Sequence, residues 1–513
     1  MEHRIYAQIE KIADPTLRNL AQTVTRLVLE NWLYVALVLF LWRYPYIVAD
    51  WTDTEVMPRR PTGQAVFWQS EMARALLLAC LAMSYNLLFG YTGIISFGHA
   101  LFFGAGGYVT FILMSEYDAS ARNPALIAVL AMGLLMAVFS KVSLRNVVIF
   151  VLIGAVLALA LLPADSEITF YQAAGLAVLV SIALSVVSGV VTLRLRGIYF
   201  TMFTLALSEM FFVLAKSGTF RDITGAEDGL GFREILPESL NPTPTFDGSR
   251  MDMYRITIVF FVIVLLAIRR YLNSPVGRVI LAIRENEERA RTIGYNTFYY
   301  KVLTMTFAGV IATLTGILSA IWATDKRIHP EALSLKFTVD PLLHVLIGGV
   351  GTLTGPIVAA LSLVLGETYL RDETFALDTH VAGTPLLVWQ ALTLVVVAIV
   401  MWLFRRLLRE GAIRVMDRFS QYTPQTVRTV YYTIVTVILT VVGLIIGSQV
   451  AQDKDLKDRV FEVADLWELA LGIVFVIVVM VLPMGIVGTW NKFLADRRIR
   501  RMERQLQQEN SHS

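Results

Sequence analysis

The chain of 513 residues is 56% hydrophobic and only 17% charged, with a mean hydropathy of +0.62. Soluble domains are about 45–50% apolar and about 25% charged, so this composition excludes an ordinary soluble protein. The net charge is +3, and the single cysteine, Cys80, excludes a disulfide framework and a cysteine metal site. We therefore predict an all-α, polytopic membrane protein.

The N-terminal segment, 1–31, is polar and mixed in charge. It lacks the short basic start and apolar core of a cleaved signal peptide. We predict that it is cytoplasmic and that the apolar run after it stays as a membrane anchor.

A helix needs roughly 17–25 apolar residues to cross a bilayer. Runs that approach or reach this length recur along the chain, and with 339–368 they make about 12–14 apolar segments. The candidate spans are 32–49, 75–90, 94–114, 124–139, 146–163, 170–193, 197–216, 254–271, 302–323, 384–404, 428–449 and 466–489.

The stretch NLLFGYTGIISFGHALFFGAGGY, 86–108, combines six glycines with His99 in an otherwise apolar run. Glycine weakens helices, and unwound backbone at membrane depth is tolerated only beside protein or a water-filled path. At helical spacing, Ser96, Ala100 and Gly104 form a small-residue stripe that lets another helix approach closely. The stretch predicts a broken or closely packed segment.

The segment 339–368 is also interrupted, by a glycine-rich run that ends at Pro356. It is either one kinked span or two half-spans, and the charge of the flanking loops favours a broken hairpin. Two interrupted segments in the two halves of a chain point to the translocation region of repeat-built transporters. Close helix packing is an equally good explanation of the glycines.

Basic residues that flank spans favour the cytoplasmic side of the membrane. We therefore place the arginine-rich stretches 269–301, 405–418 and 497–504 in the cytoplasm. The acidic loops 217–253 and 450–465 are expected outside. Both termini are then cytoplasmic.

The cytoplasmic stretch 273–301 begins with a turn in which Ser274 can cap a helix. From Val279 to Ile293 the pattern is amphipathic, and Gly294 is typical of a helix end. The pattern predicts one short, charged helix between two spans. Such a helix either docks into a groove of a partner or is a solvated connector.

Four stretches carry a family resemblance, in the family's order, over roughly residues 75 to 370. They are SYNLLFGYTGIISFGHALFFGAGGY, LRLRGIYFTMFTLALSEM, SPVGRVILAIRENEERARTIGYNTFYYK and LIGGVGTLTGPIVAA. The chain resembles the LivM-type permeases, which are membrane subunits of branched-chain amino-acid ABC importers. Related permeases serve urea, short amides and aromatic acids, so the resemblance leaves the substrate open.

The resemblance implies that 272–300 is an EAA-type coupling loop, whose short helix inserts into a cleft of an ATPase subunit. The matching positions are Arg284, Glu285, Glu288, Ala290 and Gly294. Asn286, Arg289 and Arg291 depart from the common family pattern, which bears on the choice of partner.

The implied assembly is a heterodimer with a second related permease, two ATPase subunits and a periplasmic substrate-binding protein, in the bacterial inner membrane. The acidic loop 217–253 is a docking surface for the binding protein or a plain solvated loop. No stretch of the sequence matches GxxxxGK[ST], so we expect ATP to be bound by the partner subunits and no cofactor in this chain.

Polar residues at membrane depth are candidate pathway residues by default. They are Asn86, Ser96, His99 and Glu209. Asn86 and His99 are alternatively interhelical hydrogen-bonding groups, and Glu209 a satisfied structural carboxyl. A rival function is an ion-coupled secondary transporter that uses Glu209, Asp340 or Glu367.

The six histidines show no metal-ligand spacing, and no catalytic cluster is apparent, so we expect neither a metal site nor an enzyme. We expect contact with membrane lipid and none with nucleic acid. The permease core is predicted over 32–408. Residues 409–513 form an extension with two further spans and a basic cytoplasmic tail, and its sequence points to no function.

Overall fold

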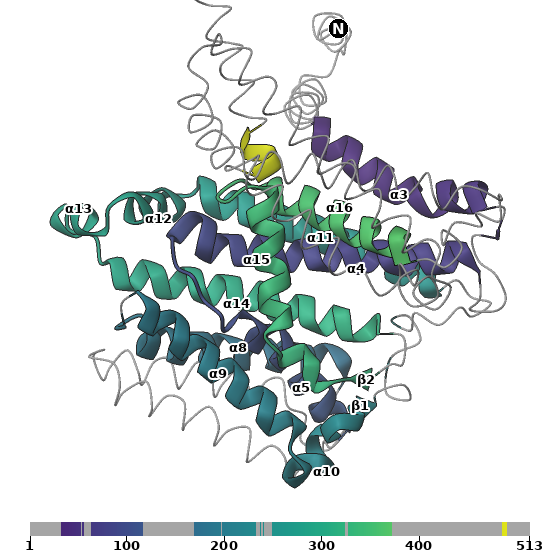
Figure 1. Ribbon diagram of the computed structural model, residues 1–513, viewed down its shortest axis with the longest axis horizontal. Helices are drawn as coiled ribbons and strands as arrows, with labels where there is room; N and C mark the ends of the chain where they lie inside the picture. Colours follow the sequence, from purple (N-terminus) through teal and green to yellow (C-terminus); the bar gives the residue numbers. More distant parts are fainter. Residues whose placement is uncertain are drawn as a thin grey trace, which may run out of the picture. The chain divides into compact units, whose positions relative to one another are not determined.

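The computed structural model describes residues 32–52, 54–55, 63–115, 169–195, 197–231, 236, 240, 249–323, 327–371 and 485–489. The chain divides into two compact units, one formed by 1–365 with 475–513 and the other by 366–474. Nearly all described elements belong to the first unit (Figure 1).

Five helices in the described part of the chain are long and apolar enough to cross a membrane. They are α4 (Gln64–Asn86), which continues as the π-helix η1 (Leu87–Thr92), α8 (Phe170–Thr192), α9 (Ile198–Lys216), α11 (Ser249–Asn273) and α14 (Thr297–Ile321). Two shorter apolar helices are α5 (His99–Ser115) and α16 (Gly355–Arg371). The prediction of an all-α, polytopic membrane protein is confirmed.

The remaining elements are the N-terminal helix α3 and a set of shorter helices and strands. They are α3 (Trp32–Thr52), η3 (Gly218–Phe220), α10 (Arg221–Thr224), η4 (Ala226–Asp228), β1 (Leu230–Gly231), α12 (Pro275–Glu285), α13 (Glu287–Thr292), β2 (Arg327–Ile328), η6 (Pro330–Leu333) and α15 (Lys336–Gly348). The strands pair antiparallel, with Leu230 opposite Ile328 and Gly231 opposite Arg327.

Most predicted spans within the described residues coincide with helices, but α4 begins at Gln64 rather than at 75. The helix continues through the polar Gln69 and Glu71 because neither glycine nor proline interrupts it. α3 forms at the first predicted span, yet it is not among the five apolar helices. The spans 124–139, 146–163, 384–404 and 428–449 lie outside the described residues, as does all but 485–489 of the predicted extension.

The core is built around α14, which packs against α4, α5 and α8. Glycines on both helices allow α5 and α14 to approach closely: a Cβ at Gly106 would lie 2.2 Å from the carbonyl oxygen of Thr313, and one at Gly316 would lie 1.9 Å from that of Phe103. Phe102 and Phe111 of α5 are fully buried here. This is the close helix packing that the small residues of 86–108 predict.

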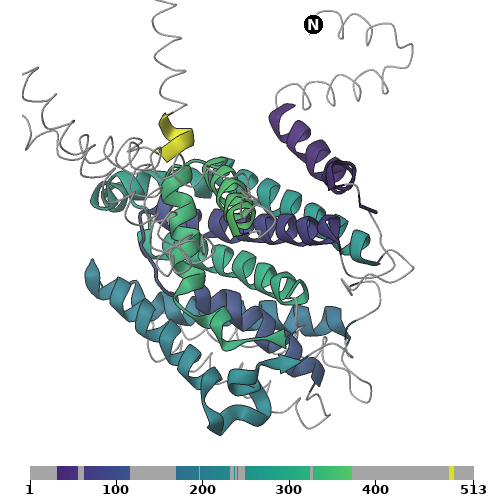
Figure 2. The same ribbon diagram turned by 45° about the vertical axis from the view of Figure 1, so that its right-hand side comes forward.

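The segment 339–368 contains two separate helices, α15 and α16, rather than one kinked span. In both views α15 runs across α4 instead of alongside it, and the two helices are in contact (Figures 1 and 2). A hairpin of two half-spans is therefore too simple a description of this segment. The charge of the loops predicts on which side of the membrane each loop lies. It carries no information about a helix such as α15 that runs across its neighbour.

Candidate functional site

Two glycine-rich breaks interrupt the helices of the core. The first, 93–98, separates η1 from α5, and the second, 349–354, separates α15 from α16. Each starts at a glycine of positive φ, Gly93 at 75° and Gly349 at 122°, where glycine can end a helix without strain. The prediction of two glycine-interrupted segments is confirmed.

Asn86, at the end of α4, joins that helix to the second break. Its side-chain amide donates to the carbonyl oxygen of Thr352 at 2.8 Å, and its Oδ1 accepts from the backbone N–H of Gly351 at 3.1 Å. A Cβ at Gly90 would lie 1.8 Å from Asn86 Oδ1, so the side chain needs glycine one turn further along. Asn86 is therefore a hydrogen-bonding tie between segments 266 positions apart in the sequence.

Threonines of neighbouring helices satisfy the unwound backbone of the first break. The N–H of Phe97 donates to Thr204 Oγ1 on α9 at 3.1 Å, and Thr338 Oγ1 on α15 donates to the carbonyl oxygen of Phe97 at 3.3 Å. Both threonines are buried. The sequence alone did not single them out, although a hydroxyl inside an apolar run such as the one around Thr204 is a usable signal.

His99 is fully buried at the start of α5. Its Nε2 lies 2.8 Å from Ser84 Oγ, and its ring meets the Tyr85 ring edge-on with 5.4 Å between centroids. Ser84 Oγ donates its one hydrogen to the carbonyl oxygen of Leu81 at 2.7 Å, so both bonds form when the protonated Nε2 of His99 donates to Ser84 Oγ. His99 thus links α5 to α4, and its Nδ1 has no partner among the described residues.

Ser96 and Glu209, the other predicted pathway residues, occupy different environments. Ser96 is fully buried in the first break, where its Oγ accepts from the N–H of Gly98 at 3.3 Å. Glu209 is half-buried on α9, next to the buried Ser208. Ser96 therefore lies in the first break and His99 directly after it, whereas Asn86 contacts the second break and Glu209 lies on α9. Their role in transport stays a prediction.

The carboxylates of the rival, ion-coupled function lie on separate helices: Glu209 on α9, Asp340 on α15 and Glu367 on α16. Across the ranges that the structure describes, no group of three or more His, Cys, Asp or Glu side chains is placed to hold a metal ion.

The coupling segment consists of two helices, α12 and α13, and the prediction of one helix over 279–293 is wrong. The break falls at Asn286, whose backbone is extended, with φ −159° and ψ 104°. Its Oδ1 accepts from the N–H of Arg289 at 2.9 Å and so caps α13. Ser274 caps α12 as predicted, accepting from the N–H of Gly277 at 3.3 Å.

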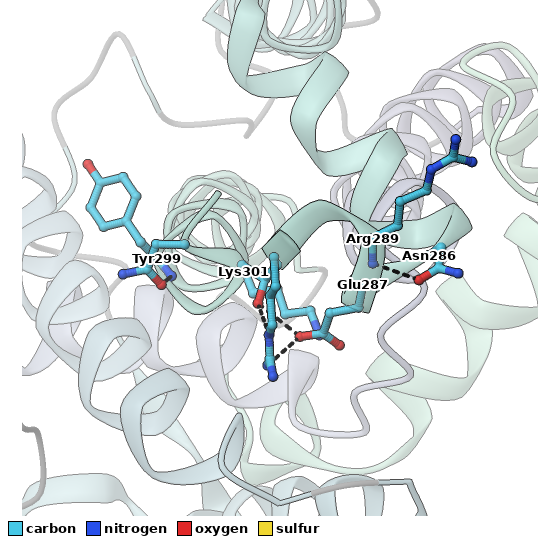
Figure 3. A network of polar contacts seen from close by, with 8 residues as sticks. Asn286, Glu287, Arg289, Tyr299 and Lys301 are labelled. Carbon is cyan, nitrogen blue, oxygen red and sulfur yellow. Dashed lines mark hydrogen bonds and ion pairs between the residues drawn. The ribbon is translucent and has the colours of Figure 1, made fainter. Parts of the chain in front are cut away.

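Glu287 fixes α13 to the start of α14 (Figure 3). Its carboxylate lies 2.7 Å from Lys301 Nζ and 2.9 Å from Arg291 Nη2, and it accepts from Thr297 Oγ1 at 3.0 Å. Burial alone would raise the pKa of Glu287, but the hydrogen bonds and charges of these partners outweigh it and lower that pKa. The sequence alone did not single out Glu287.

The five implied coupling residues divide by exposure. Arg284, Glu285, Glu288 and Gly294 are exposed, whereas Ala290 lies on the buried face of α13. Gly294 has φ 100° and follows the end of α13, as predicted for a glycine at a helix end. Exposed apolar side chains accompany them at Leu281, Ile293, Tyr295 and Tyr299, the first on α12 and the others after α13 or at the start of α14.

The family described as the branched-chain amino acid transport system permease component matches residues 70–404. Among curated proteins, the high-affinity branched-chain amino acid transport system permease protein LivM of Salmonella typhimurium is 28% identical over 222 residues. That match covers 40% of this chain and 51% of the relative. The protein of the same name from Escherichia coli is 27% identical over the same length and shares.

The probable LivM permease protein of Methanocaldococcus jannaschii is 25% identical over 313 residues, 56% of this chain and 77% of that relative. The chain thus spans about half the length of the two bacterial relatives. No solved structure matches it significantly. Nothing in these comparisons supports the ion-coupled alternative. The family match covers well over half of the sequence and includes both breaks and the coupling segment, so the chain belongs to the family of permease components of branched-chain amino acid transport systems.

Proposed function

We propose that the chain is the permease subunit of an ATP-driven ABC importer that moves branched-chain amino acids, or similar small polar solutes, into the cytoplasm. The family and the names of the relatives support the substrate class. The observation that carries the ATP-driven mechanism is the α12–α13 segment, a capped pair of short helices with an exposed, charged and apolar surface.

Separate ATPase subunits would drive the transport, one of the two docking on α12–α13. A docking surface needs a buried apolar centre and a polar rim. Ile293, Tyr295 and Tyr299 offer the apolar part, and Glu285 and Glu288 lie on the charged part. The Glu287 network holds α13 against α14, so a push on α13 is carried into a helix of the core. ATP would be bound by those subunits, and this chain would need no cofactor.

A second, related permease subunit would complete the membrane part of the importer, and a periplasmic binding protein would deliver the substrate. The ordered segment after α9 is the proposed docking surface for the binding protein. Ion pairs hold it in place, Arg221 with Asp228 at 2.6 Å and Lys216 with Glu227 at 3.2 Å. Its strand β1 pairs with β2, and β2 follows the C-terminal end of α14 in the chain. The helix α13 comes just before the N-terminal end of α14.

These two surfaces therefore lie at opposite ends of α14, a helix of 25 residues, which is about 37 Å long. That length spans a bilayer core. It supports an orientation in the bacterial inner membrane with the coupling segment in the cytoplasm and the binding-protein surface outside. With this orientation goes the further proposal that both termini are cytoplasmic.

The transport pathway would run beside the two breaks, where Asn86, Ser96 and His99 bring polar groups to membrane depth. Neutral polar groups and unwound backbone lower the barrier for an ammonium and a carboxylate without binding them tightly. Glu209 would line or gate the same path from α9. The binding protein would then supply the affinity.

Reconstitution into liposomes tests this function. Wild-type chain with its ATPases, second permease and binding protein should accumulate labelled leucine when ATP is supplied inside. The chain alone should not accumulate it under a proton or sodium gradient. Accumulation by the chain alone under an ion gradient would contradict the ATP-driven mechanism. Competition by urea, acetamide and phenylacetate against leucine would then define the substrate class.

A further inference from the structure

Arg284, in the last turn of α12, lies against both glycine breaks. Its Cγ lies 3.5 Å from the position of a Cβ built on Gly93, the first residue of the first break. Its Nη1 lies 2.7 Å from a Cβ built on Gly351, in the second break. One side chain of the coupling segment therefore borders two interruptions that are far apart in the sequence.

Glycine at 351 makes room for this side chain, whereas a Cβ at Gly93 would be in ordinary van der Waals contact with it. Both residues have φ 75°, the left-handed region that other residues adopt only with strain. A Cβ at Gly351 would also lie 3.0 Å from the carbonyl oxygen of Gly90. The two glycines and Gly90 thus form a notch with Arg284 at its mouth.

The notch suits a cation. η1 ends at Thr92 and α15 ends at Gly348, so both helices present their C-terminal ends near it. The last carbonyl groups of a helix lack intrahelical partners and carry a partial negative charge. A guanidinium between two such ends is favourable, and its planar donors match carbonyl oxygens.

The apolar side of α12 is fixed to the same elements. Ile280 is 1% exposed and belongs to one core cluster with Leu87 and Tyr91 of η1 and Ile357 of α16. Asn86, at the end of α4, bonds to the backbone of the second break. The guanidinium of Arg284 lies against the same break, so α12 borders the segment that Asn86 holds.

We propose that Arg284 is a positioning residue that holds α12 and the two breaks together, so that a displacement of α12 moves both breaks at membrane depth. This rests on the proposed function for its purpose, but the contact itself is independent of it. The consequence is that losing Arg284 uncouples α12 from the breaks without removing the surface on which an ATPase docks.

A distance measurement on the full chain tests the contact. Spin labels are placed at Leu281 on α12 and Ile95 in the first break, both exposed, in a Cys80→Ser background. The parent and an Arg278→Ala control, which removes an exposed arginine of the same helix, should give one narrow distance distribution. Arg284→Ala should broaden or shift it, and Arg284→Lys should restore part of the narrow peak. An Arg284→Ala distribution identical to the parent's would overturn the proposal.

Transport measurements test the consequence. In proteoliposomes with the partner subunits, Arg284→Ala should lower the amount of substrate moved per ATP hydrolysed about tenfold, the effect of losing one contact to a charged group. Binding of the ATPase subunits should be unchanged. If Arg284→Ala weakened the binding of the ATPase subunits but left the amount of substrate moved per ATP unchanged, Arg284 would be a docking residue. That result would overturn the proposal. If the wild-type assembly moves no substrate at all, the proposed function fails, while the label distances still decide the contact of Arg284.

Discussion

Asn86 and His99 belong to the same stretch of sequence, and the structure uses them differently. Asn86 donates one hydrogen bond and accepts another, both across to the second break. His99 engages Ser84 through Nε2 only. For Asn86 the interhelical role is therefore accounted for by its own bonds, whereas His99 keeps a buried Nδ1 without a partner among the described residues.

Replacing Asn86 tests the tie between α4 and the second break. In Asn86→Ala the N–H of Gly351 loses its acceptor in a part-buried site, which should cost about 1–3 kcal/mol of stability. The measurement is the midpoint of thermal unfolding in detergent. Asn273→Ala, at the last residue of α11, is the control and should be near neutral. Equal unfolding midpoints for the two variants would contradict a stabilising role for the hydrogen bonds of Asn86.

Gly90 provides a second test at this scale. A Cβ at Gly90 would lie 1.8 Å from Asn86 Oδ1 and 2.6 Å from the nitrogen of Gly351, so Gly90→Ala should destabilise by about 1–3 kcal/mol. Gly366→Ala, in helix α16, meets nothing within 4 Å and should be neutral or stabilising by up to about 1 kcal/mol. Denaturant titration of both variants checks this. The idea fails if Gly90→Ala is as stable as Gly366→Ala.

At the scale of the element, the coupling segment shows how a polar cap divides an amphipathic run. The apolar positions Val279, Ile280 and Ile283 and the later Ala290 lie on buried faces, as one continuous helix would also place them. Asn286 nevertheless leaves the helical region and caps a new helix with its own side chain. Periodicity does not register this, because it reflects where apolar residues face and not whether the backbone between them is continuous.

The Glu287 network makes the position of α13 depend on pH. The pKa of Glu287 is lowered in the folded chain, so the carboxylate stabilises the docking of α13 above its ordinary pKa of about 4.3. That stability is lost as the pH falls through the lowered, folded-state pKa. Hydrogen exchange of the α13 amides, corrected for the intrinsic effect of pH, should therefore accelerate on acidification.

Two variants separate this effect from general acid unfolding. Glu287→Gln removes the titrating group, so its α13 amides should lack the pH-dependent step. Glu288→Gln changes the exposed neighbour, which makes no part of the network, and should keep that step. The same pH dependence in all three proteins would rule out Glu287 as its source.

At the scale of the whole molecule, the coupling segment should govern communication with the motor. Glu288→Ala removes an exposed carboxylate, and Gly294→Ala places a side chain at φ 100°, with a strain of about 1–3 kcal/mol. Both should abolish stimulated ATP hydrolysis and uptake in proteoliposomes and leave membrane insertion intact. Asp50→Ala, which removes an exposed carboxylate of α3, is the control. Normal uptake by the Glu288 and Gly294 variants would refute the coupling role.

The sequence by itself predicted several local features around the site, as well as the helical fold. It placed both breaks, because glycine acts through its own φ, as at Gly93 and Gly349. It placed the start of α12 at Ser274, because a cap is a local signal. It did not reveal the cap at Asn286 or the network of Glu287, whose partners Thr297 and Lys301 come from the next helix.

The membrane class, the all-helical fold and the existence of two interrupted segments result from hydropathy, glycine and charge, which are properties of short stretches of chain. The tertiary structure alone decided that these segments meet, that Asn86 bonds α4 to the second, and that Thr204 and Thr338 satisfy the first. It alone brought Arg284 to both. Such contacts join residues that are remote in sequence, and they form only when helices pack closely enough for backbone and side chains to touch.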